Sequence, residues 1–139
     1  MSADLSRFLD AQDRGGTYEQ ALAELRAGRK HGHWIWFVFP QVMGLGRSTA
    51  SQYYAISGLD EARAYLAHPV LGPRLVKCAR ALLDLPGSDA VAVLGSVDAQ
   101  KLRSSMTLFA TADGDPVFAQ VLDKYFGGTP DELTLGRLL

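Results

Sequence analysis

The residues best able to do chemistry lie close together between residues 28 and 49. Imidazole titrates near neutral pH, so His33 is a candidate general acid or base in this segment. Lys30 adds a positive charge, and the indoles of Trp34 and Trp36 offer flat surfaces on which a planar base stacks. The segment therefore indicates a pocket for a planar, anionic ligand, while packing into the core is the alternative explanation of its aromatic residues.

A glycine-containing turn follows this aromatic block. Gly44 and Gly46 permit a tight turn, and Ser48 precedes a helical pattern over residues 50–56. Backbone amides at a helix start carry partial positive charge and bind phosphate. The spacing is neither that of a Walker loop nor that of a dinucleotide-binding loop. We expect either a phosphate-binding turn, with Gln41 among the ligand-binding residues, or an ordinary capped loop.

Two further groups of polar residues lie later in the chain. Asp98, Lys101 and Ser105 recur at positions i, i+3 and i+7, which places them on one face of a helix. That face is either a solvated surface with a weak ion pair or a row of donors and one carboxylate that lines a cleft. His68 and Arg74 flank a probable turn at Gly72 and are candidate ligand-binding residues, although a surface ion pair is the commoner role of an arginine.

The composition limits the class of protein. The chain has 139 residues, 47% of them hydrophobic and 21% charged, which fits a single folded domain over residues 1–139. A net charge of −1 argues against a nucleic acid partner. The absence of a signal-peptide pattern and of an apolar run long enough to cross a bilayer leads us to expect a cytoplasmic protein without a membrane partner. With one cysteine and three histidines, we expect no metal and no cofactor.

Helical patterns occupy nearly the whole sequence. Apolar residues recur at helical spacing between start and stop residues, and a capping box is expected from Thr17 to Gln20. Only the block from Trp34 to Phe39 is ambiguous, because periodicity does not decide between a strand and a buried helix there. The sequence predicts an all-α fold, a compact single-domain bundle of about eight short helices.

Several long motifs resemble a known family. They are His33–Gln41, Gly44–Ser48, His68–Leu75, Lys101–Phe109 and Lys124–Gly128, and together they are similar to domain-of-unknown-function family 1810. The resemblance covers nearly the entire chain and implies a small, mostly helical, single-domain bacterial protein. Some relatives carry the name calpastatin, which no residue of this sequence supports.

A weaker similarity concerns the NADAR (YbiA-like) family. Asp98, Lys101 and Met106 resemble that family's Asp-x-x-Lys-x-x-x-Met segment with one inserted residue, while its Glu-His element is absent. This similarity implies N-glycosidic chemistry on ligands of the ADP-ribose type. Shared ancestry of a fold does not by itself carry an activity with it.

These observations combine into one hypothesis and one rival. In the hypothesis, a single cleft built from residues 30–48, 68–74 and 98–107 binds a phosphorylated, nucleotide-like small molecule and hydrolyses an N-glycosidic bond. His33, Asp98 and Lys101 are then the catalytic candidates. In the rival, the protein is a non-catalytic binding or protein-interaction module whose aromatic block belongs to the core. The oligomeric state is left open.

Overall fold

The computed structural model describes residues 4–112 and 114–138, and within them the chain is helical throughout, which confirms the all-α fold class. The elements are α1 (Ser6–Asp13), the 3₁₀ turn η1 (Arg14–Gly16), α2 (Thr17–Ala27), α3 (Ile35–Val38), α4 (Thr49–Tyr53), α5 (Leu59–Ala67), α6 (Leu71–Leu83), α7 (Ala90–Leu94), α8 (Ser96–Thr111), α9 (Val117–Phe126) and α10 (Glu132–Leu138). The described residues form ten α-helices, of which α3, α4 and α7 are only four or five residues long, in keeping with the bundle of about eight short helices expected from the sequence.

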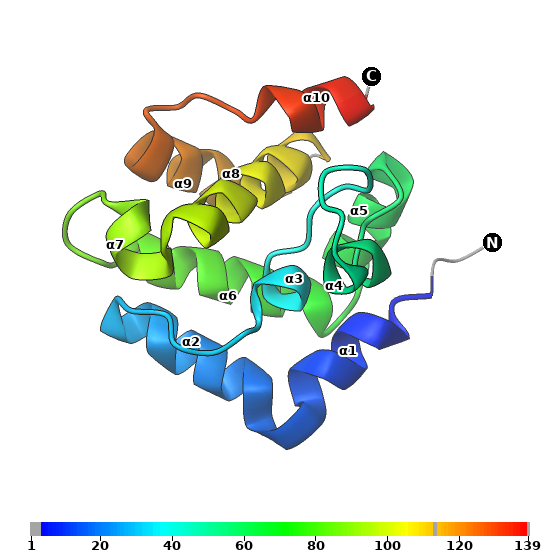
Figure 1. The fold of residues 1–139 in the computed structure, drawn as a ribbon, viewed down its shortest axis with the longest axis horizontal. Coiled ribbons are helices and arrows are strands. Elements are labelled where there is room, and N and C mark those ends of the chain that lie inside the picture. The colour runs from blue at the N-terminus through cyan, green and yellow to red at the C-terminus, as the bar shows by residue number, and fades with distance from the viewer. Residues whose placement is uncertain (1–3, 113, 139) are drawn as a thin grey trace.

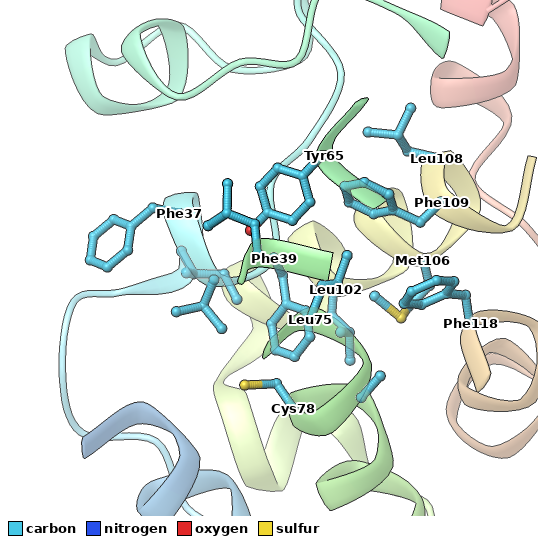
Figure 2. Packing of buried hydrophobic residues seen from close by; sticks show 14 of the residues in the cluster. Phe37, Phe39, Tyr65, Leu75, Cys78, Leu102, Met106, Leu108, Phe109 and Phe118 are labelled. Atoms are coloured by element: carbon cyan, nitrogen blue, oxygen red, sulfur yellow. The ribbon is translucent and has the colours of Figure 1, made fainter. Parts of the chain in front are cut away.

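Helices α6 and α8 form the centre of the molecule. Helix α6 packs against α2, α5 and α9, and α8 packs against α5, α7, α9 and α10 (Figure 1). Phe109 of α8 lies between Tyr65 and Phe118, with ring centroids 5.4 Å and 5.8 Å apart (Figure 2). Each such fully buried side chain contributes about 1.5–3 kcal/mol to the stability of the fold.

The ambiguous aromatic block forms a buried helical turn. The Val38 amide bonds to the Trp34 carbonyl at 3.1 Å, and the Phe39 amide bonds to the Ile35 carbonyl at 3.0 Å. Trp34, Ile35 and Phe39 are each at most 1% exposed. Because every residue of this stretch except Trp36 is buried, it has no regular alternation of apolar and polar residues, and its periodicity did not reveal the helix.

The capping box predicted at the start of α2 is wrong. Gly16, in the left-handed region with φ of 72°, precedes the helix, and Thr17 is already its first residue. The Thr17 hydroxyl donates to the Arg14 carbonyl at 2.6 Å instead of accepting from α2. The Gln20 amide donates to Glu24 at 2.9 Å rather than reaching back to the cap. A left-handed glycine pair makes this turn without a side-chain cap.

Residues 43–55, which include α4, leave the bundle and return to it as one excursion. A parallel bridge between Val42 and Ile56 closes the excursion at its neck, where the Ile56 amide bonds to the Gln41 carbonyl at 2.8 Å. The Arg7 guanidinium of α1 donates to two carbonyls at the returning end, each at 2.9 Å. The neck is therefore fixed by backbone hydrogen bonds and by one long side chain.

Candidate functional site

Two of the three predicted stretches come together around Asp98. The Lys30 ammonium lies 2.8 Å from Oδ2 of Asp98, and the Lys101 ammonium lies 3.6 Å from Oδ1. Lys101 also lies over the ring of Trp36, with Nζ 5.3 Å from the ring centroid. We call these four residues, Lys30, Trp36, Asp98 and Lys101, the Asp98 cluster. It joins the segment before α3, α3 itself and the first turns of α8.

The charges of the Asp98 cluster are largely removed from water. The side chains of Lys30, Asp98 and Lys101 are 9%, 17% and 20% exposed. Two cations and one anion leave a local charge of about +1, and an added anionic group 4 Å away would gain about 4 kcal/mol of Coulomb attraction at an effective dielectric constant of 20, before its own desolvation cost. The cluster therefore favours an additional anion.

Two polar atoms near the cluster lack a hydrogen-bond partner among the described residues. They are Nε1 of Trp36 and Oγ of Ser105, and both are buried. Ser105 is 0% exposed and stands one helical turn after Lys101, so it shares the face of α8 that carries the cluster. An unpaired buried donor costs about 1–3 kcal/mol, and an acceptor atom of a ligand would recover part of that cost.

Glu24 of α2 positions the segment that carries Lys30. Its Oε1 accepts hydrogen bonds from the amides of His31 (2.7 Å) and Gly32 (2.9 Å) and from Nε1 of Trp34 (2.9 Å). Burial acts to raise the pKa of Glu24, but the hydrogen bonds from Gly32, His31 and Trp34, with that of Gln20, outweigh it and lower the pKa to about 2. Because the ionised carboxylate holds three donors, it fixes the direction of the segment.

Sequence reasoning missed Glu24. A glutamate in the last turn of an amphipathic helix is an ordinary surface residue by pattern, and the partners of Glu24 lie beyond the helix end at Gly28. Lys30 itself is held by two further bonds, from its amide to the Val93 carbonyl at 2.8 Å and from its ammonium to the Gly32 carbonyl. The contacts of Glu24 and Lys30 join residues at no characteristic sequence spacing, so the sequence does not predict them.

Trp34 and His33 do not belong to the Asp98 cluster in the way the sequence suggested. Trp34 is 1% exposed, with Lys30 Nζ 5.1 Å from its ring centroid, so no face is open for a ligand to stack on. Its indole N–H is occupied by Glu24. His33 is exposed and lines a different groove together with Arg14. Stacking is therefore left to Trp36, which is half-buried.

The glycine turn lies in the 43–55 excursion and is occupied by the protein's own side chains. The Arg137 guanidinium contacts Gly44, where a Cβ would be 2.6 Å away, and donates to its carbonyl at 3.3 Å. Gly46 lies against Ser51, where a Cβ would be 2.4 Å from another Cβ. The Ser48 hydroxyl accepts from the Ser51 amide at 3.1 Å and caps α4. Gln41 uses its carbonyl at the neck. The glycine at position 44 is thus explained by its φ of 92°, and Gly46 by the close approach of Ser51.

The third predicted stretch has structural roles of its own. Nδ1 of His68 accepts hydrogen bonds from the amides of Val70 and Leu71, both at 3.1 Å, and so caps the start of α6. Arg74 pairs with Asp13 at 2.8 Å and lies over a tyrosine of α2. Among residues 4–112 and 114–138, no hydrogen bond or ion pair joins His68 or Arg74 to the Asp98 cluster. Of the three predicted stretches, only residues 30–48 and 98–107 thus meet at the Asp98 cluster.

Comparison with known proteins identifies the family. Residues 2–138 match the family described as "Protein of unknown function (DUF1810)". The chain belongs to this family. The crystal structure of the conserved hypothetical protein Rv1873 from Mycobacterium tuberculosis is similar in fold, with a TM-score of 0.93 and 48% sequence identity over 97% of this chain and 96% of that one. No curated protein matches the chain.

The function of this DUF1810 protein must be argued from its site, since neither the family nor Rv1873 carries a named activity. In the part of the chain that the structure describes, no three His, Cys, Asp or Glu residues group to hold a metal ion. No helix in the same part is both long and apolar enough to cross a bilayer. The Asp98 cluster remains the main concentration of charge beside an aromatic ring.

Proposed function

We propose that the protein binds a phosphorylated, nucleotide-like small molecule of the ADP-ribose type at the Asp98 cluster and hydrolyses its N-glycosidic bond. The observation that carries the proposal is a half-buried carboxylate, that of Asp98, between two ammonium groups beside a half-buried indole. Cations for a phosphate, a ring for a base and a carboxylate for proton transfer are the three parts such a reaction uses.

Each residue of the cluster has one role in this reaction. Lys101 and Lys30 hold the phosphate oxygens, and Trp36 stacks on the base while its unpaired N–H donates to a ligand acceptor. Asp98 accepts a proton from water as the water oxygen bonds to the anomeric carbon. The carbon–nitrogen bond breaks with its electron pair passing to the base, which takes a proton from solvent. Ser105 donates its free hydroxyl at the inner end of the site.

The rival candidate is a binding module that uses the same cluster without catalysis. The burial of the aromatic block supports it in part, because every residue of Trp34–Phe39 except Trp36 belongs to the core. The two candidates share the ligand class and differ in the role of Asp98. In the module, the carboxylate only orders the two lysines, and no bond of the ligand breaks.

Binding is tested by isothermal titration calorimetry with ADP-ribose, NAD and AMP. For the wild-type chain we expect a dissociation constant that Lys101→Met raises by at least tenfold, since it removes one phosphate contact while keeping the length of the side chain. Lys77→Met, at an exposed lysine of α6, is the matched control and leaves the constant unchanged. Absence of binding by all three compounds to a folded wild-type protein would overturn the proposal.

Catalysis is tested separately, by chromatography of the free base released from ADP-ribose and NAD. Asp98→Asn is expected to keep binding within a few-fold and to lose at least a hundredfold in rate, because an amide accepts no proton from water. Circular dichroism confirms that the variant is folded. Binding without release of base by the wild-type protein would replace the hydrolase by the binding module.

A further inference from the structure

A second groove lies on the other side of the segment that carries Lys30. Its volume is about 260 Å³, and its walls come from α1, η1, α2, the 32–34 segment, α3 and Tyr54. Gly32 is shared between the two sides, since its carbonyl accepts from Lys30 of the Asp98 cluster while the residue lines the groove. We call this the Arg14 groove, and no residue of the Asp98 cluster lines it.

The Arg14 groove has an unpaired arginine on its wall, while the Glu24 carboxylate lies behind it, bonded to Gln20, Gly32 and Trp34. Arg14 and His33 line it, both exposed, and no aspartate or glutamate belongs to its walls. Among the residues that the structure describes, the Arg14 guanidinium makes neither an ion pair nor a hydrogen bond, whereas Arg7 and Arg74, the other two arginines in contact with α1, are both paired with carboxylates. The guanidinium of Arg14 is therefore free to form the bidentate bonds with which arginine binds carboxylates and phosphates.

The rest of the wall consists of two polar side chains and of aromatic rings. Thr17 and Gln20 also line the groove, with the Thr17 hydroxyl donating to the Arg14 carbonyl and the Gln20 amide donating to Glu24. Phe37 and Tyr54 contribute two rings, with ring centroids 5.3 Å apart and tilted by 54°. Burial raises the pKa of the Tyr54 phenol, so it stays neutral at physiological pH and is available as a donor. Two rings and an exposed guanidinium along one groove match a ligand with a flat apolar body and one anionic group.

We propose that the Arg14 groove is a second binding site, for a small organic anion in which a carboxylate or phosphate is attached to a compact ring. The anionic group pairs with Arg14 and His33, and the ring packs on Phe37 and Tyr54. The volume of about 260 Å³ admits a single ring with its anionic group and excludes a dinucleotide. The site differs in residues and in ligand size from the Asp98 cluster.

The test titrates the full chain with phenyl phosphate, benzoate or inorganic phosphate. Binding is measured by the shifts of the ¹⁵N amide signals in NMR spectra. Phenyl phosphate or benzoate is expected to shift the amides of Thr17, Gly32 and His33 saturably, and the comparison of the two tells which anionic group the groove prefers. Arg14→Gln is expected to weaken binding by at least tenfold. Arg29→Gln, at an exposed arginine outside the groove, is the matched control and leaves binding unchanged.

Three outcomes would overturn the inference. No saturable shift of these amides at millimolar probe removes the site, and equal binding by the Arg14→Gln variant removes the role of the guanidinium. Inorganic phosphate binding as tightly as phenyl phosphate removes the role of the rings. Lys101→Met is expected to leave phenyl phosphate binding at the groove unchanged, so failure of the function proposed for the Asp98 cluster and failure of this inference give different results.

Discussion

The first prediction concerns the carboxylate of Glu24, which fixes the position of the segment that carries Lys30. Glu24→Gln keeps the size of the side chain and removes the charge that accepts three hydrogen bonds from the 31–34 segment. The pKa of Glu24 lies at about 2 against an ordinary value of 4.5. At 1.36 kcal/mol for each pH unit, this difference corresponds to about 3.4 kcal/mol as an upper bound. Because the side chain is partly solvent-screened, we expect the variant to lose about 1–2 kcal/mol at pH 7.

The pH dependence gives the sign of the same effect. A folded-state pKa below that of the unfolded chain contributes stability that is complete above about pH 4.5 and is lost as pH falls toward 2. The difference between wild type and Glu24→Gln should therefore shrink on acidification through this window. Urea unfolding followed by tryptophan fluorescence, at pH 7 and at intervals below pH 4.5, measures it.

A matched control separates this effect from a general loss of helix charge. Glu19→Gln changes an exposed glutamate of the same helix, which holds no donor from the 31–34 segment, and should alter the free energy of unfolding by less than about 0.5 kcal/mol. Equal unfolding free energies for the Glu19→Gln and Glu24→Gln variants at pH 7, or a difference from wild type that does not change with pH, would refute the reasoning.

Two further predictions concern the packing of the bundle. Gly72→Ala should cost about 3 kcal/mol in thermal unfolding, because its Cβ would lie 2.1 Å from the backbone carbonyl oxygen of Leu66, while Gly136→Ala, where nothing lies within 4 Å, should not destabilise. Thr134→Val should cost about 2 kcal/mol in urea unfolding, because it leaves the buried Ser104 and Asp131 without a shared partner, and an unchanged midpoint would contradict this role.

Helices could be predicted from the sequence wherever one face is apolar and the ends carry glycine or proline. The α9 pattern, with its stop at Gly127, is such a case, and the structure has a helix there. The turn over Ile35–Val38 could not be assigned, because side chains buried on all sides give no period. The cap predicted at Thr17 is wrong because Gly16, in the left-handed region, precedes the helix and Thr17 is already its first residue.

The sequence predicted which residues belong to the site better than it predicted how they are arranged in space. Helical spacing correctly put Asp98, Lys101 and Ser105 on one face, because that rule depends only on the local backbone. The directions of Lys30 and Trp34 depend on Glu24, because this residue joins α2 to the loop that follows the helix. Sequence spacing does not show such a contact. His33 points into a separate groove because loop direction, unlike helix phase, is set by tertiary hydrogen bonds.

The bridge between Val42 and Ile56 limits how far a change in the 43–55 segment affects the rest of the fold. Because Val42 and Ile56 complete the core and meet each other directly, the chain between them can change in length or composition without moving either residue. Insertions near Arg47, at the tip of this segment beside the pocket of about 420 Å³ between Met43 and Ser57, are therefore expected to leave the helices that hold Asp98 in place.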